Sequence, residues 1–462
     1  MMIRVKYIAT EDGRELAYFP DTQRFFFVDD EMKELISDME KLDKNHVLEK
    51  YGIDPDTYDS YLAKMILVEK DSGLPLENSP DPEELSFEQR ILPRLVIHLA
   101  NDCNLRCVYC YANGGTYNSA HGMISREVLD RTLDVFYKEY YKIEMIQLFG
   151  GEPLMNREML EYTCKRIRDI DDKRGTKTDI GLVTNGTLID AEFIDLLKKY
   201  NISVTVSLDG APAINDRLRI FPNGSGTGDV ILKKMHMLED AVGTHFGIEA
   251  TYSRYHEEAG ITVMDLFDYL NGEFPGTGIH IVPAGGSPDC DFVLRDQGAF
   301  VQAVHQVGER AAQDPDREIE CHATAMAAFK SLEEKDKKPQ EFFCGAGTAT
   351  IDVTTTGDIY PCFMLADVKD VWLGNVCDPD VLHSRQYAET IKRYLNFCYK
   401  MNNAECVDCF ANTICSACVG QFYLNTGELF KLSPADCDRY RGQLTEAIKG
   451  LAKIQEAKEA KR

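Results

Sequence analysis

An alternation of short apolar runs with amphipathic helical stretches between residues 94 and 283 constrains the fold of this 462-residue chain more than any other feature. Such an alternation is typical of a parallel sheet covered by helices. Because strand–helix–strand crossovers are right-handed, six units predict an α/β fold, an incomplete (β/α)6 TIM-like barrel with its chemistry at the carboxyl ends of the strands. The predicted strands are Arg94–Leu99, Glu144–Phe149, Asp179–Val183, Ser203–Ser207, Gly247–Thr251 and Ile279–Pro283.

Composition and charge narrow the functional class. With 44% hydrophobic residues, the chain can bury a sizeable core. Its formal net charge of −25 would repel a phosphate backbone, so we expect no nucleic-acid partner. We find neither a signal-like start nor about 18 consecutive apolar residues, and therefore expect no membrane partner and a cytoplasmic location. Fifteen cysteines in a reducing compartment favour metal ligation over disulfides.

Changes in composition divide the chain into domains. The amino-terminal part predicts a strand, a hairpin that turns at Pro20, Asp21 and Thr22, and three short helices. A stretch rich in proline and acidic residues then predicts a linker. The predicted domains are a peptide-binding unit at 1–70, a linker at 71–90, the barrel at 91–320, and a cysteine-rich domain with a closing helix at 321–462.

Three cysteines stand directly after the first predicted strand, where a loop can wrap their thiolates around one metal cluster. They are Cys103, Cys107 and Cys110. Iron–sulfur clusters are normally held by four cysteines, so this loop leaves one iron of a four-iron cluster without a protein ligand. A zinc knuckle that takes His121 as its fourth ligand is the alternative interpretation.

Three polar segments follow the next predicted strands, and we expect them on the same rim as the cysteine loop. The segments are Gly150-Gly151-Glu152-Pro153, Thr184-Asn185-Gly186-Thr187 and Ser207-Leu208-Asp209-Gly210. Glycines allow the backbone to approach a ligand closely. Asp209 can equally form a turn, and Arg219 is either a partner for a ligand carboxylate or a solvated side chain.

Together these motifs resemble the radical S-adenosylmethionine (SAM) enzymes. The resemblance implies a 4Fe-4S cluster on the three cysteines, whose open iron chelates SAM, and cleavage of SAM to a 5'-deoxyadenosyl radical. It further implies that the Tyr109 main chain lies against the adenine, while Gly150, Gly151 and the Glu152 carboxylate or adjacent main chain meet the ammonium group. Asn185 is expected near the ribose, and Ser207 at the methionyl carboxylate.

The carboxy-terminal cysteines resemble the SPASM extension, which carries two auxiliary iron–sulfur clusters. The resemblance assigns Cys406, Cys409, Cys415 and Cys437 to an outer cluster, and Cys344, Cys362 and Cys418 to an inner one. The spacing between Cys415 and Cys418 is one residue shorter than usual, which puts this partition in doubt. The inner cluster therefore either keeps an open iron or takes Cys377 or Cys398 as its fourth ligand.

Two other interpretations of the cysteines, one with zinc as the metal and one with no metal, stay open. Two C-x-x-C pairs between Cys406 and Cys418 also suit a zinc ribbon. The remaining cysteines, Cys164, Cys290 and Cys321, are most simply buried small apolar residues.

The amino-terminal unit resembles the winged, PqqD-like elements that bind leader peptides, and a free sheet edge can accept such a peptide as an extra strand. A structural cap is the alternative. The combination predicts a maturase of a ribosomally synthesised precursor peptide that forms a sulfur-to-carbon thioether crosslink, as SCIFF (ranthipeptide) maturases do, with a flavodoxin or ferredoxin as electron donor.

Other functions are weighed beside this one. Carbon–carbon crosslinking and sulfatase-type oxidation are the enzyme alternatives. Sulfatase-maturing relatives carry an aspartate at the position of Phe363, so this residue argues against sulfatase-type oxidation. A zinc-binding peptide-recognition scaffold is the non-enzymatic alternative.

Overall fold

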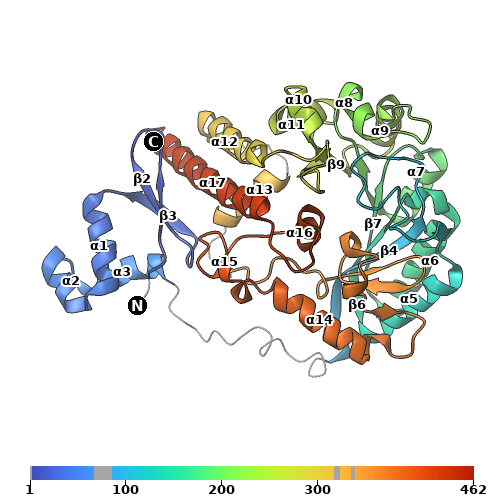
Figure 1. Ribbon diagram of the computed structural model, residues 1–462, viewed down its shortest axis with the longest axis horizontal. Coiled ribbons are helices and arrows are strands. Elements are labelled where there is room, and N and C mark those ends of the chain that lie inside the picture. The colour runs from blue at the N-terminus through green and yellow to red at the C-terminus, as the bar shows by residue number, and fades with distance from the viewer. Residues whose placement is uncertain (1–2, 67–85, 317–322, 334–338, 462) are drawn as a thin grey trace.

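The computed structural model describes residues 3–66, 86–316, 323–333 and 339–461. Most of the predicted linker and Cys321 lie outside these ranges. Figure 1 shows an amino-terminal unit, a sheet flanked by helices, and a carboxy-terminal part that lies between them.

The amino-terminal unit is a three-stranded antiparallel meander followed by three helices, as the sequence predicts. Each helix begins after an aspartate, at Asp29, Asp43 and Asp54, whose carboxylate accepts hydrogen bonds from free amides of the first turn. Strand order β1-β2-β3 leaves β3 with one unpaired edge. The elements are β1 (Lys6–Ala9), β2 (Glu15–Phe19), β3 (Arg24–Val28), α1 (Asp30–Lys41), α2 (Lys44–Tyr51) and α3 (Pro55–Met65).

Six parallel strands form the centre of the molecule in sequence order, which confirms the predicted strand–helix alternation. Their side chains and the covering helices build the largest apolar core. The sheet is open and mixed, because a short antiparallel strand, β5 (Gly122–Met123), also pairs with β4. The six strands are β4 (Ile91–Asn101), β6 (Lys142–Gly150), β7 (Asp179–Thr184), β8 (Ile202–Ser207), β9 (Phe246–Tyr252) and β10 (Gly278–Pro283).

Helices return the chain between these strands and cover the sheet (Figure 1). In the parts of the chain that the structure describes, no helix has both the length and the hydropathy to cross a membrane. The helices are α5 (Arg126–Glu139), α6 (Arg157–Arg174), α7 (Ala191–Tyr200), α8 (Pro212–Leu218), α9 (Gly228–Val242), α10 (Arg254–Glu258), α11 (Val263–Glu273), α12 (Gly298–Gln313) and α13 (Ala323–Glu333).

The carboxy-terminal part continues the same sheet. Its first strand, β11, runs parallel to β4 and pairs Ile351 with Leu95, so the sheet order is β10-β9-β8-β7-β6-β4-β11-β12-β13. The domain boundaries predicted from composition treat the cysteine-rich region as a separate domain, and they do not predict this pairing of β11 with β4. The elements are β11 (Thr350–Val353), β12 (Asp358–Tyr360), β13 (Gly374–Asn375), α14 (Arg385–Cys398), α15 (Ala404–Val407), α16 (Val419–Thr426) and α17 (Pro434–Ala460).

The amino-terminal unit docks on α17. Ile8, Leu16 and Tyr18 of its sheet pack against α17 residues such as Leu444 and Ile448. Burial of large apolar side chains is worth about 1.5–3 kcal/mol each, so this contact carries most of the docking energy.

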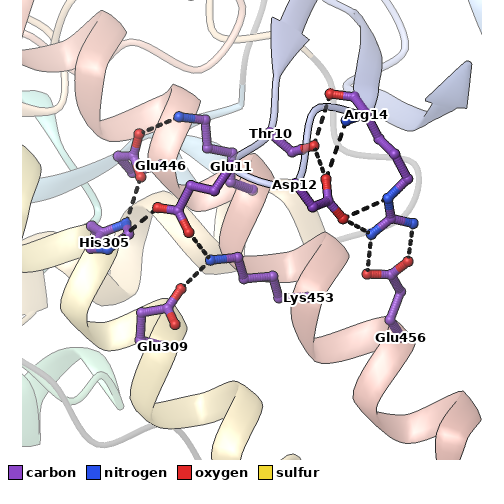
Figure 2. A network of polar contacts seen from close by, with 10 residues as sticks. Thr10, Glu11, Asp12, Arg14, His305, Glu309, Glu446, Lys453 and Glu456 are labelled. Carbon is purple, nitrogen blue, oxygen red and sulfur yellow. Dashed lines mark hydrogen bonds and ion pairs between the residues drawn. The ribbon is translucent and has the colours of Figure 1, made fainter.

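Polar contacts also join the amino-terminal unit to α12 and α17, as Figure 2 shows. Glu11 accepts a hydrogen bond from Lys453 at 2.9 Å, and Lys453 also pairs with Glu309 of α12. Arg14 forms a bidentate pair with Glu456. Partly exposed ion pairs contribute about 0–1 kcal/mol each, so they orient the unit more than they stabilise it.

Candidate active site

A cavity of about 630 Å³ opens at the carboxyl ends of the parallel strands. One wall comes from strand ends, including Phe149 of β6 and Ser207 of β8. The other wall comes from the carboxy-terminal part. It includes Cys415 and Cys418, and also Gln443 of α17. A volume of this size suits a drug-sized ligand. The cavity therefore brings two regions that are distant in the sequence to one space.

The loop that carries Cys103, Cys107 and Cys110 begins directly after β4. Main-chain hydrogen bonds hold it to the segment after α8: Arg106 N–H donates to the Ile220 carbonyl at 2.7 Å, and Val108 N–H to the Leu218 carbonyl at 2.9 Å. Burial raises the pKa of the Cys103 thiol to about 12 and of the Cys107 thiol to about 11. Iron ligation requires the thiolates, so cluster binding would release these protons.

Two glycines let this loop pack against the end of β6. A Cβ atom on Gly151 would lie 2.1 Å from the Asp102 carbonyl oxygen, and one on Gly150 would lie 2.4 Å from the Ala100 carbonyl oxygen. Gly150 also has φ of +127°, which other residues rarely adopt. The glycines predicted for ligand approach thus first serve the approach of the cysteine loop itself.

The Glu152 carboxylate is fully buried and already has three donors. It accepts hydrogen bonds from Thr184 Oγ1 at 2.8 Å, Asn185 N at 2.8 Å and Leu154 N at 3.0 Å. Burial raises the pKa of Glu152, and the three hydrogen bonds oppose that shift. The carboxylate therefore joins the ends of β6 and β7, and the adjacent main chain is left as the group that can meet a ligand ammonium.

Asn185 reaches from the end of β7 to the cysteine loop. Its Nδ2 donates to Asn104 Oδ1 at 2.9 Å and lies 3.6 Å from the Cys103 sulfur. Its Oδ1 accepts from the Thr187 amide and hydroxyl. These bonds fix the Asn185 side chain beside the first cysteine.

Tyr109, Asp209 and Arg219 form a buried network at the end of β8. The Tyr109 hydroxyl donates to Asp209 Oδ2 at 2.5 Å and accepts from Arg219 Nη1 at 2.6 Å. Arg219 is 7% exposed and Asp209 fully buried. Both open questions about these residues are answered: Arg219 is not a solvated side chain, and Asp209 pairs with it across a tyrosine that lines the cavity, as Ser207 does.

His256 contacts the main chain of Asp209 in this network, and its burial predicts a pH-dependent stability. Its Nε2 donates to the Asp209 carbonyl at 2.8 Å, and its Nδ1 accepts from Ser253 N at 3.1 Å. Burial lowers the pKa of His256 below its usual 6.5. Below pH 6.5 the unfolded chain then binds more protons than the native chain, so the free energy of unfolding should decrease as the pH is lowered, by up to about 1.4 kcal/mol per pH unit.

Urea denaturation of the apoprotein between pH 7.5 and 5 measures this slope. A His256→Gln variant should flatten it, whereas replacing the exposed His236 in the same way should leave it unchanged. An equal slope in wild type and His256→Gln would contradict the prediction.

The zinc-knuckle interpretation has little support in the local geometry. His121 is 62% exposed in its side chain and pairs with Asp102 at 3.2 Å. Tetrahedral zinc needs four ligands at 2.0–2.3 Å.

The four cysteines predicted for the outer cluster lie around a second cavity, of about 490 Å³. It is lined by Cys406, Cys409, Cys415 and Cys437. Burial, and then the charge of Cys415, raises the pKa of Cys406 to about 11 and of Cys437 to about 12. Four thiols around a space of this size fit a cluster of several metal atoms.

Sequence reasoning missed one residue of this cavity. Lys400 is buried beside the four thiols, and its Nζ donates to the Gln340 and Asn412 carbonyls at 2.5 and 2.6 Å. Burial lowers the pKa of Lys400 to about 8. Nothing in the local sequence distinguishes this lysine from a solvated one, because its environment is made by segments far along the chain.

The thiols predicted for the inner cluster also lie near one another. Burial is the main cause that raises the pKa of the Cys362 thiol. The charges of Cys418 and Cys344 raise it further. Cys398 is buried beside them, whereas Cys377 is exposed on the turn after β13. Among the remaining cysteines, Cys164 is buried in the main core, as predicted, whereas Cys290 is only partly buried, so the prediction was wrong for that residue.

Comparison with known proteins gives matches over the parallel strands and beyond. Residues 97–249 match a protein family described as the Radical SAM superfamily. The chain is 31% identical over 157 residues to an uncharacterised protein of Methanocaldococcus jannaschii, an alignment that spans 34% of this chain and 52% of the relative. The chain thus spans about half the length of that relative.

Two named relatives align over longer stretches. Radical SAM cyclopropyl synthase TigE of Paramaledivibacter caminithermalis is 23% identical over 366 residues, which is 74% of this chain and 71% of TigE. The antilisterial bacteriocin subtilosin biosynthesis protein AlbA of Bacillus subtilis is 24% identical over 286 residues, which is 60% of this chain and 56% of AlbA.

Two solved structures share the fold. Native anSMEcpe with bound AdoMet has a TM-score of 0.64 and 19% identity, over 79% of this chain and all of that chain. Streptococcus suis SuiB bound to precursor peptide SuiA has a TM-score of 0.54 and 16% identity, over 94% of this chain and 98% of SuiB.

Proposed function

We propose that this chain, an enzyme of the radical SAM superfamily, matures a ribosomally synthesised precursor peptide by crosslinking one of its residues. The observation that carries the proposal is the cavity between the strand ends and the carboxy-terminal cysteines, together with a groove on the amino-terminal unit. A small-molecule enzyme would need only the first of these.

A 4Fe-4S cluster and SAM are the cofactors of this enzyme. We propose Cys103, Cys107 and Cys110 as the cluster ligands, and the main chain at Glu152, with Ser207, as part of the SAM site. When bound, cluster and SAM supply a 5'-deoxyadenosyl radical. Two auxiliary clusters on the carboxy-terminal cysteines are part of the proposal.

The groove supports leader recognition. It has a volume of about 840 Å³ and lies along the unpaired edge of β3, between that edge, α3 and α17. An extended peptide can add to such an edge as a fourth strand. Phe25, Phe26 and Met65 give it an apolar floor.

Charge favours an acidic leader. Arg24, Lys64 and Lys458 line the groove, and none of them has a carboxylate partner among the residues that the structure describes. Glu333 is the acidic residue of the lining. In a chain of net charge −25, such a group of cations is a local basic surface that can steer an acidic peptide.

Reversing these charges should weaken leader binding. An Arg24→Glu, Lys64→Glu variant should raise the Kd for the synthetic leader at least about tenfold, because like charges then face an acidic peptide. Fluorescence anisotropy in 0.1 M salt measures it. Lys41→Glu, on the exposed end of α1, is the control, and an equal Kd in both variants and wild type would contradict the site.

Two products are considered. A sulfur-to-carbon thioether is the first, and the similarity to AlbA supports a bacteriocin-type precursor. A carbon–carbon bond is the second, and the similarity to the cyclopropyl synthase TigE over three quarters of this chain favours it. Either product removes one hydrogen atom to the adenosyl group, and one proton with one electron, which equals the electron that SAM cleavage consumes.

Other functions have less support. Phe363 lines the cavity and packs on Phe149 with ring centroids 4.7 Å apart, so the position where sulfatase-maturing relatives carry an aspartate offers no base here. A zinc-binding scaffold would give colourless protein with zinc and no sulfide, whereas the enzyme should be brown and contain iron.

Anaerobic turnover with SAM, a flavodoxin or ferredoxin as the proposed electron donor, and the precursor encoded beside the gene tests the function. Mass spectrometry should find a peptide lighter by two hydrogens per crosslink. Alkylation of free thiols then separates the products, because a thioether removes one alkylation site and a carbon–carbon bond removes none. An unchanged peptide, despite formation of 5'-deoxyadenosine, would contradict the proposed substrate.

A further inference from the structure

Cys398 occupies the last position of α14 and is completely buried. Two main-chain hydrogen bonds hold its segment against the segment that leads to Cys344. Phe343 N–H donates to the Cys398 carbonyl at 3.0 Å, and Lys400 N–H donates to the Glu341 carbonyl at 2.9 Å. This short antiparallel pairing sets Cys398 opposite Phe343, the residue before Cys344, and Cys344 packs against the apolar cluster that contains Cys398.

The thiols of the inner group are electrostatic neighbours of Cys398. Burial raises the pKa of Cys398 first, and the charges of Cys344 and Cys418 raise it further. Cys418 caps α16, where its sulfur accepts the Gln421 amide at 3.4 Å. Cys398 therefore lies inside the group of thiols proposed for the inner cluster.

Tyr394 is an independent observation at the same place. It lies one helical turn before Cys398 on α14 and so on the same face. Its side chain is fully buried, and its hydroxyl interacts with the Cys398 thiol and with no other group in the described structure. Buried hydroxyls are rarely left unpaired, so this contact marks the Cys398 sulfur as its acceptor.

The surroundings of that hydroxyl identify the acceptor. Burial raises the pKa of Tyr394 well above its usual value, and the charges of four thiols add to this shift. They are Cys398, Cys344, Cys362 and Cys418. The Tyr394 hydroxyl thus lies beside Cys398, in the packed cluster that also includes Cys344 and Cys362, as expected for a group that hydrogen-bonds to an iron–sulfur cluster held by them.

We propose that Cys398 is the fourth protein ligand of the inner iron–sulfur cluster, with Cys344, Cys362 and Cys418, and that the Tyr394 hydroxyl donates a hydrogen bond to the cluster sulfur. The assignment rests on the auxiliary clusters of the proposed function. Cys377, the other candidate, lies on an exposed turn whose neighbour Val376 bonds to Arg131 of α5.

Full ligation has a consequence for the reaction. No iron of the inner cluster is then free to bind the thiolate of a substrate cysteine. The cluster would carry electrons only, so a thioether would need its sulfur activated elsewhere. The inference therefore favours the carbon–carbon product among the two that were considered.

The test uses full-length protein in which Cys103, Cys107 and Cys110 are alanine, so that only the auxiliary clusters contribute to the spectra. No SAM or peptide is added, so the result does not depend on SAM cleavage, on leader binding or on the product formed. In this background, Cys398→Ala should lower iron and sulfide by up to half, or give a three-iron EPR signal after oxidation. The parent EPR spectrum should not change when cyanide or a small thiol is added.

Cys377→Ala and Cys398→Ser are the matched variants. Cys377→Ala should keep the parent iron content and spectrum. Cys398→Ser keeps the size of the side chain and so avoids the cavity that alanine would leave. If Cys398 is a ligand, this folded variant should show the same change in its EPR spectrum as Cys398→Ala. Tyr394→Phe should retain iron but lower the reduction potential of one cluster, because it removes a hydrogen bond to sulfur.

Four outcomes would overturn the assignment. The first is identical iron content and EPR spectra in the parent and Cys398→Ala, and the second is a parent spectrum that shifts with added thiol. The third is iron loss in Cys377→Ala instead, and the fourth is stoichiometric zinc in place of iron in the background protein.

Discussion

Cys103→Ala protein, reconstituted anaerobically and reduced with dithionite, should form no 5'-deoxyadenosine above background from SAM. Removal of one of the three proposed thiolate ligands should prevent the loop from holding the cluster on which SAM cleavage depends. Liquid chromatography of the quenched reaction measures the product. The affinity for the leader should be unchanged, because the groove on β3 and α17 is remote from this loop.

The exposed Cys377 gives the matched control for this loss. Cys377→Ala removes one thiol from the same chain and should leave the rate of 5'-deoxyadenosine formation at the wild-type value. Full activity in Cys103→Ala would refute the whole assignment of the radical site. Loss of leader affinity in the same variant would instead indicate a folding defect.

Arg219→Met should lower the free energy of unfolding by about 3–5 kcal/mol, the typical cost of leaving a buried charge without its partner. Arg219 and Asp209 are both buried and joined through the Tyr109 hydroxyl, so the Asp209 carboxylate would stay in the core without its cation. Urea denaturation of the apoprotein measures the change. Adding Asp209→Asn to the variant should recover part of the loss.

Arg217→Met is the control for the same substitution two positions away. Arg217 is half exposed and lies 3.7 Å from Glu258, so its loss should cost no more than about 1 kcal/mol. Equal losses in the two variants would show that the Tyr109, Asp209 and Arg219 network carries no special stability.

The sequence predicts the parallel strands well, because their local pattern is repeated six times. Each strand observed from β4 to β10 in the parallel sheet overlaps its predicted range. The prediction failed to anticipate β11. Thr350–Val353 is a four-residue strand, and its partner β4 lies some 250 positions earlier, so no local pattern marks the pairing.

The candidate site also has a part that the sequence predicts and a part that it does not. The cysteine motifs can be read from spacing alone, whereas the roles of Glu152 and Arg219 depend on burial and on partners from other strands. Lys400 and Tyr394 show the limit most clearly, since only the folded chain places them beside thiols from three separate segments.

Helix α17 forms a wall of both the cavity at the strand ends and the groove on the amino-terminal unit. Leu444 lines the first and Leu451 the second, seven positions apart on one continuous helix. At 1.5 Å per residue the helix separates them by about 10 Å. Since an extended peptide covers at most 3.3–3.6 Å per residue, the proposed peptide substrate needs a spacer of at least about three residues between its anchored segment and its reacting side chain. The proposed function therefore predicts a minimum spacer length, and precursors with shorter spacers should bind without being processed.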